Sequence, residues 1–182
     1  MDNGASSYRR FLDGDKKAFE EIVRAYREGL TFFINRYVRD LVAAEDIAMD
    51  VFVELVVHPN RYNFTTSLKT YLYMMGRSRS LDYLRRGKQA TVELSEVEEW
   101  LAEEQLLEAR ILADERKRKV HEALEQLPED MRVAVYLVYF EEFSYDEAAG
   151  VMKKNRKQVD NLLYRARAKL RTILGKEVEW IL

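Results

Sequence analysis

Residues 144–171 read SYDEAAGVMKKNRKQVDNLLYRARAKLR, and this stretch decides the fold of the second half of the chain. Ser144 and Glu147 have the spacing of a capping box, in which the two side chains satisfy free N–H groups at the start of a helix. A short helix to Met152, a turn, and an Asn155 cap then lead into a long helix that ends near Leu174. This order predicts a helix-turn-helix, whose second helix can lie in the major groove of DNA.

The second helix of this pair carries side-chain types suited to DNA. Asn and Gln can read adenine edges, Arg can read guanine, and Lys pairs with phosphates. Helix pairs of this kind are also common in structural α-helical bundles, so spacing alone leaves both interpretations open. The candidate residues for duplex binding are Asn155, Arg156, Lys157, Gln158, Asn161, Tyr164 and Arg165.

Apolar residues recur at helical spacing upstream of this motif as well. Helices are predicted over 15–27, 30–38, 43–57, 66–86, 114–127 and from Pro128 onward. Thr66 is the expected cap of the fourth of these helices, and Gly87 its end. The chain has 7 Gly and 2 Pro and no segment with strand alternation, so the sequence predicts an all-α fold.

Charge is unevenly distributed along the chain although its total is small. The formal net charge is -2, but residues 61–90 carry +6, residues 91–115 carry −8 and residues 153–176 carry +8. Clustered, solvated helix faces are one explanation of such blocks. Two basic blocks on either side of an acidic one favour two binding surfaces for polyanions. We therefore expect helical domains at 1–88 and 114–182, joined by an acidic linker at 89–113.

Aromatic and basic residues are interleaved between residues 61 and 86. Aromatic rings beside cations suit unstacked bases and a single-strand backbone. Leu68 and Leu72 are expected to be ordinary core, whereas Tyr62 and Phe64 are harder to explain in that way. The preceding helix at 44–57 is acidic with apolar residues between the acids, which fits a solvated face or a surface for a protein partner.

The sequence contains no recognisable catalytic, metal-binding or cofactor-binding motif. There is no Cys, which excludes disulfides, thiolate chemistry and cysteine-ligated metal, and the two histidines, His58 and His121, are far apart. HExxH, Gly-rich phosphate loops and GxSxG are missing. No apolar stretch approaches membrane-spanning length and the N-terminus lacks a signal-peptide pattern. We expect a cytoplasmic protein that is not an enzyme, has no cofactor and does not insert into membranes.

Four segments together resemble a known family. The segments DKKAFEEIVRAYREGL (15–30), AEDIAMDVFVELV (44–56) and LKTYLYMMGRSRSLDYLRR (68–86) resemble region two of bacterial RNA polymerase sigma factors of the extracytoplasmic-function (ECF) group. Residues 123–171 are similar to region four of the same group. The resemblance implies a sigma factor that binds core RNA polymerase and promoter DNA, with an anti-sigma factor as a possible further partner.

The resemblance also implies roles for individual residues. It implies that the chain contacts both the β′ clamp helices and the β subunit of polymerase. The residues that would dock on the clamp helices are Glu45, Asp46, Ile47, Asp50, Val51, Glu54 and Leu55. The residues that would melt the minus-ten element and capture a flipped base are Arg61, Tyr62, Asn63, Phe64, Lys69, Tyr73, Arg77, Ser78, Arg79, Arg85 and Arg86. The helix starting at Asn155 would read the minus-thirty-five duplex. Two alternatives stay open: a stand-alone helix-turn-helix regulator, and a sigma-like mimic that binds an anti-sigma factor and no DNA.

Overall fold

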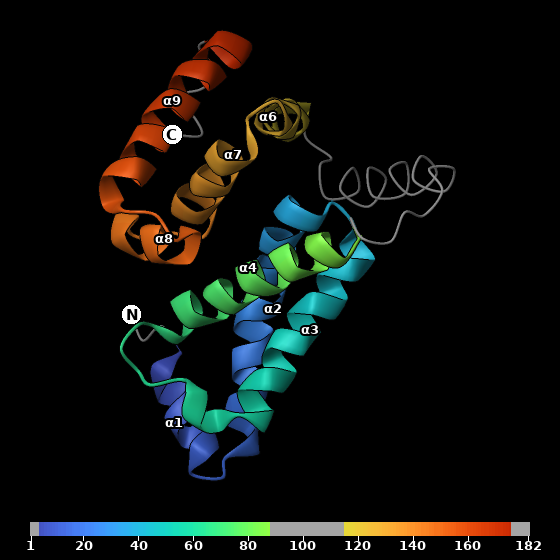
Figure 1. Cartoon of the computed structure of the whole chain (residues 1–182), viewed down its shortest axis with the longest axis vertical. Coiled ribbons are helices and arrows are strands. Elements are labelled where there is room, and N and C mark those ends of the chain that lie inside the picture. Colours follow the sequence, from blue (N-terminus) through green and yellow to red (C-terminus); the bar gives the residue numbers. More distant parts are fainter. Residues whose placement is uncertain (1–3, 88–114, 176–182) are drawn as a thin grey trace. The chain divides into compact units, whose positions relative to one another are not determined.

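The computed structural model describes residues 4–87 and 115–175 (Figure 1). The predicted acidic linker at 89–113 lies outside the described residues. Every regular element within the described residues is helical, which confirms the predicted all-α class. None of the described helices is long and apolar enough to cross a membrane. The helices form two compact units, and each is described by itself.

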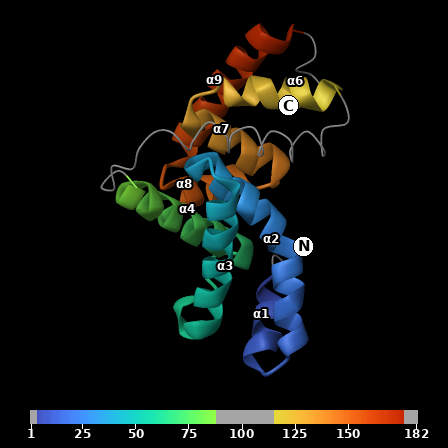
Figure 2. The ribbon, with the colours of Figure 1, turned by 90° about the vertical axis from the view of Figure 1, so that its right-hand side faces the viewer.

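The first unit contains four α-helices and one short 3-10 turn. They are α1 (Ala5–Leu12), α2 (Lys16–Val38), α3 (Leu41–Val57), η1 (Pro59–Arg61) and α4 (Leu68–Gly87). The sequence predicts neither α1 nor the continuity of α2, which spans two segments that the apolar spacing separates. The pairs α2–α3 and α1–α2 pack against each other, and both views show α1 beside the N-terminal part of α2 (Figure 1 and Figure 2).

Short polar caps set where these helices begin. The Asp15 side chain accepts a hydrogen bond from Lys17 N at 3.0 Å, and Asp40 accepts one from Ala43 N at 2.9 Å. At the start of α4, Ser67 Oγ accepts from Thr70 N at 3.0 Å. Ser67 therefore occupies the cap position that the sequence assigns to Thr66, and that assignment is wrong by one residue.

The core of the first unit lies between α2, α3 and α4. Its fully buried side chains include Ile22, Leu30, Phe33, Ile34, Phe52, Leu55, Leu68, Leu72 and Tyr73. Gly76 lies in the middle of α4, where a Cβ atom would be 2.9 Å from Leu30 Cδ1 and 3.3 Å from Ile34 Cγ1. The glycine thus lets α4 approach α2 closely. This close packing offsets the low propensity of glycine for a helix interior.

The second unit contains α6 (Glu115–Glu125), α7 (Glu129–Val135), η2 (Tyr136–Phe140), α8 (Tyr145–Met152) and α9 (Arg156–Leu174). The η2 segment is a single π-helical turn that continues α7. Helix α9 packs against α6 and α7. The buried side chains between them include Leu127, Met131, Leu137, Phe143, Val159, Leu163, Ala166 and Leu170.

Candidate functional site

The outer face of α3 combines exposed carboxylates with exposed apolar side chains. Glu45, Asp46 and Asp50 are exposed. Met49 and Val53 lie one helical turn apart and are 47% and 51% exposed. Since the inner face of α3 is apolar as well, an apolar outer face indicates a surface that a partner covers. Val42, Val56 and Val57 add further exposed apolar area on the same helix.

Three of the residues predicted for docking do not belong to this face. Ile47, Val51 and Leu55 are buried, and their spacing of four residues forms the inner stripe of α3, which packs against α2. In the described structure these three side chains are therefore not part of the exposed face of α3. The same spacing of four, applied to Met49 and Val53, identifies the outer stripe that the sequence analysis missed.

Two acids of α3 form an ion-pair cluster with two arginines predicted to bind DNA. Arg79 Nη1 lies 3.3 Å from Asp50 Oδ2. One carboxylate oxygen of Glu54 contacts the Arg61 guanidinium, and the other contacts that of Arg79. The hydrogen bond from Arg79, together with the contact to Arg61, holds the pKa of the Glu54 carboxyl below its ordinary value. The predicted docking and DNA-binding residues therefore meet in one cluster.

The rings that the sequence assigns to base capture divide into buried and partly exposed ones. Tyr62 is 3% exposed, and its hydroxyl donates to the Thr66 carbonyl oxygen at 2.7 Å. Tyr73 is fully buried, with its ring centroid 4.9 Å from that of Phe33. Both rings are therefore packed in the core of the described structure and present no face to a base there.

Tyr62 belongs to an aromatic cluster that supports the loop between η1 and α4. Its ring centroid lies 5.6 Å from that of Tyr8, 4.6 Å from that of Phe64 and 5.1 Å from that of Tyr71. Tyr8 comes from α1, and burial is the main reason why its pKa is raised to about 12. The sequence does not predict the role of Tyr8 in supporting this loop, because no local pattern relates Tyr8 to residues more than fifty positions later.

The tip of the same loop is fixed by a local hydrogen-bonded turn. Asn63 Oδ1 accepts from Thr65 N at 3.1 Å and from Thr65 Oγ1 at 2.7 Å. Phe64 is partly exposed and has a left-handed backbone with φ of 59°. A bulky residue rarely adopts this conformation, and such residues concentrate at binding sites. Phe64 is therefore a partly exposed ring at the tip of this loop.

The other candidate residues of α4 lie along its solvent side or at its end. Ser78, Arg85 and Arg86 are exposed, and Arg85 contacts Asp82. Lys69 and Arg77 are partly exposed. Lys69 Nζ lies 5.8 Å from the centroid of the Tyr73 ring. The buried Tyr73 ring thus lies beside the Lys69 cation.

Both predicted helix caps of the second unit are present. Glu147 Oε2 accepts from Ser144 N at 2.9 Å, and Ser144 Oγ accepts from Glu147 N at 3.3 Å. Asn155 Oδ1 accepts from Gln158 N at 2.9 Å, while Gln158 Oε1 accepts from Asn155 N at 2.8 Å. The amide oxygens of Asn155 and Gln158 are thus engaged by the backbone, and their NH₂ groups are the parts suited to an acceptor on DNA.

Helix α9 has a buried face and an exposed polar face. Val159, Leu163, Ala166 and Leu170 point into the unit, whereas Lys157, Asn161, Tyr164 and Arg165 are exposed. Arg156, at the first turn, is held by Asp146 of α8, with 3.0 Å between Nη1 and Oδ2. Lys154 in the turn pairs with Asp130 at 3.0 Å. This separation of faces is what a helix inserted into a DNA groove requires.

Among the residues that the structure describes, no group of three or more His, Cys, Asp or Glu is arranged to hold a metal ion. The exposed groups are instead cations, amides, rings and carboxylates at helix surfaces. Such an arrangement can bind polyanions and protein surfaces.

The two units coincide with two known sequence families. The family described as Sigma-70 region 2 matches residues 22–90, and Sigma-70, region 4 matches residues 117–170. RNA polymerase sigma-H factor of Pseudomonas aeruginosa is 30% identical over 167 residues, which are 87% of this chain and 86% of that protein. ECF RNA polymerase sigma-E factor of Escherichia coli is 28% identical over 167 residues, 87% of each chain.

Solved structures share the fold at lower sequence identity. CnrH, solved in complex with the cytosolic domain of CnrY, gives a TM-score of 0.63 at 21% identity and covers 96% of both chains. The sigma factor RpoE, solved with the anti-sigma factor NepR from Bartonella quintana, gives a TM-score of 0.62 at 19% identity. That match covers 87% of this chain and 97% of the solved one.

Proposed function

Because the chain belongs to the ECF group of RNA polymerase sigma factors, we propose how its two units divide the work of promoter-directed transcription initiation. The chain binds core RNA polymerase and promoter DNA, as members of this family do. Sigma factors are non-catalytic initiation factors, so this chain contributes binding and positioning while polymerase supplies the chemistry. Its place of action is then the cytoplasm, where polymerase works.

The first unit, within residues 1–88, is the polymerase-binding and minus-ten domain of this proposal. The outer face of α3, with Glu45, Asp46, Met49, Asp50 and Val53, docks on the β′ clamp helices. The apolar residues supply buried area, and the carboxylates supply complementarity to a basic partner.

The loop before α4 and the exposed cations of α4 bind the melted minus-ten strand. Phe64 offers a ring face to an unstacked base, and stacking of this kind contributes about 1–3 kcal/mol per base. Arg61, Lys69, Arg77, Arg79, Arg85 and Arg86 neutralise phosphates, while Asn63 and Ser78 offer polar groups to base edges. Tyr62 and Tyr73 act from the core, by holding the loop and Lys69.

The second unit, within residues 114–182, reads the minus-thirty-five duplex. Asn155, Arg156, Lys157, Gln158, Asn161, Tyr164 and Arg165 lie at the start or on the exposed face of α9. The observation that carries the whole proposal is that region 2 and region 4 matches occur in order, each lying almost wholly on a different compact unit. A stand-alone regulator does not need a polymerase-docking face, and a mimic that binds no DNA does not need the exposed basic and amide side chains of α9. The sigma factor RpoE was solved in complex with the anti-sigma factor NepR, which supports an anti-sigma factor as a further partner of this chain.

Reconstituted transcription tests the proposal. The purified chain is added to core polymerase and a pool of promoter fragments, and transcripts are counted with and without the chain. We expect initiation from a defined subset of fragments. No initiation, combined with a shift of duplex DNA by the chain alone, would identify a stand-alone regulator. No initiation, combined with no DNA binding by the chain alone or with core polymerase, would identify a mimic.

A further inference from the structure

Helix α1 precedes the residues matched by the region 2 family, yet it is anchored on the proposed promoter loop. Tyr8 is fully buried, and its hydroxyl donates to the carbonyl oxygens of Leu55 at 3.0 Å and Pro59 at 3.2 Å. Its ring centroid is 6.1 Å from that of Phe64. The Tyr8 side chain therefore joins α1 to the end of α3, to η1 and to Phe64 of the loop.

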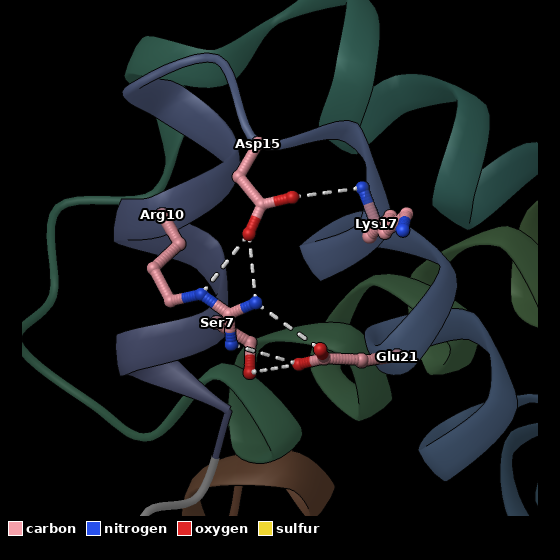
Figure 3. A network of polar contacts seen from close by, with 5 residues as sticks. All are labelled: Ser7, Arg10, Asp15, Lys17 and Glu21. Carbon is pink, nitrogen blue, oxygen red and sulfur yellow. Dashed lines mark hydrogen bonds and ion pairs between the residues drawn. The ribbon is translucent and has the colours of Figure 1, made fainter.

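A second set of contacts fixes α1 from the other side. Arg10 lies 2.7 Å from Asp15 Oδ2 and 3.0 Å from Glu21 Oε2, and Ser7 Oγ donates to the same Glu21 oxygen at 3.3 Å (Figure 3). These contacts join α1 to the first turns of α2. The charge of Arg10 is thus matched by two carboxylates.

The neighbouring arginine, Arg9, has a different environment. Successive helix residues point about 100° apart, so Arg9 leaves the helix in another direction from Arg10. Its guanidinium carbon lies 4.8 Å from the centroid of the Phe64 ring, and the side chain is exposed. Within residues 4–87 and 115–175, no carboxylate lies within ion-pair distance of Arg9, whereas Arg61 and Arg79 both contact Glu54.

We propose that Arg9 is a further promoter-binding residue, which pairs with a backbone phosphate of the melted strand where that strand passes Phe64. An aromatic face beside an arginine without a counter-ion is the combination that binds single strands. The strand's phosphate supplies an anion that residues 4–87 and 115–175 do not place beside Arg9. The inference rests on the proposed function, since it assigns one more contact to the same loop.

The test compares holoenzymes containing wild-type chain, Arg9→Gln, Arg9→Lys or Arg10→Gln. The probe is a promoter fragment selected in the transcription assay, with its minus-ten region pre-melted by mismatches. Binding is measured over a range of salt concentrations. We expect Arg9→Gln to weaken binding and to reduce the slope of log affinity against log salt by about 0.7, the share of one phosphate on a single strand. Arg9→Lys keeps the slope, because it keeps the cation.

Arg10→Gln is the matched control, because it removes another exposed arginine of the same helix that already has two acidic partners. It should leave the salt slope unchanged. Equal slopes for wild type and Arg9→Gln, or equal losses for Arg9→Gln and Arg10→Gln, would overturn the inference while leaving the proposed function intact. A wild-type chain that selects no promoter at all would instead overturn the proposed function.

Discussion

Arg79 and Asp50 form an ion pair between α4 and α3, with 3.3 Å between Nη1 and Oδ2. The same arginine also contacts Glu54, which in turn contacts Arg61. Two positive and two negative charges therefore cancel at the point where the proposed polymerase-binding helix meets the proposed promoter-binding segment. Part of the basic block of this segment is neutralised within the protein, and this neutralisation can be measured.

Glu54→Gln should raise the affinity of the free chain for single-stranded DNA. The substitution removes the charge that both Arg61 and Arg79 face, so these arginines become more attractive to phosphates. Fluorescence anisotropy with a labelled mixed-sequence oligonucleotide measures the change. Glu45 is an exposed residue of the same helix, and Glu45→Gln controls for the loss of one negative charge. An equal gain in both variants would show a general charge effect rather than release of the arginines.

The stability of the chain should depend on the ionisation of Glu54 at acid pH. Its pKa is held below the ordinary value of 4.5, chiefly by Arg79. A depressed pKa means that the stabilisation is fully present above about pH 4.5 and is lost as the pH falls through the folded-state pKa. Urea unfolding at neutral pH and at about pH 3 should show a smaller difference for Glu54→Gln than for wild type. Equal differences would mean that the ion pairs do not contribute to folding.

Val53→Lys should weaken binding to core polymerase with little effect on folding. Val53 is half exposed, so substitution should change the free energy of unfolding by no more than about 0.5 kcal/mol. Leu55→Ala serves as the contrast, because it empties a buried position on the opposite side of α3 and should cost about 2–5 kcal/mol. Surface-bound core polymerase and thermal unfolding provide the two measurements. Normal polymerase binding by Val53→Lys would place the docking surface elsewhere.

Phe64→Ala should impair open-complex formation more than polymerase binding, since the ring is partly exposed at the tip of a fixed loop. Permanganate reactivity of unpaired thymines in the promoter reports opening. Tyr62→Phe is the comparison: it removes only the hydroxyl bonded to Thr66 and should lower the free energy of unfolding by about 0.5–1.5 kcal/mol. Equal loss of opening and polymerase binding in Phe64→Ala would contradict base capture.

Lys157→Gln and Asn161→Ala should affect duplex binding differently. Lys157 lies in the first turn of α9, where loss of a phosphate contact would reduce the salt slope by about 0.9 on duplex DNA and weaken all sequences alike. Asn161 lies on the exposed face one turn later, and its loss should relax the preference for a single base pair by about 1–3 kcal/mol. Selection of bound duplexes from a random library distinguishes the two. A uniform loss for Asn161→Ala would exclude base reading.

Several features that depend on contacts between near neighbours in the chain are predicted correctly from local sequence patterns. The caps at Ser144 and Asn155 depend on partners three residues away, and both are present as predicted. The helical class follows from apolar spacing in the same way. The exposed and buried faces of α9 also follow from this spacing, because the inner positions recur every three or four residues.

Long-range contacts explain what the sequence did not predict. Tyr8 is 47 residues from its partner Leu55, and Glu54 is 25 residues from Arg79. The mixture of rings and cations between 61 and 86 is the same whether a ring faces solvent or the core, so the sequence does not show that Tyr62 and Tyr73 are buried. Only the packing of α1 and α2 against the segment distinguishes them.

The close approach at Gly76 has a consequence for how freely this chain can vary. Arg77, Ser78 and Arg79 follow directly, so a side chain at 76 would require either that Leu30 and Ile34 shift or that the helix carrying three proposed promoter contacts moves away from them. At Gly150 of α8, by contrast, a Cβ atom would meet nothing within 4 Å. Two glycines in helix interiors thus carry different mutational constraints: a side chain at Gly76 requires its neighbours to shift, whereas one at Gly150 meets no neighbour.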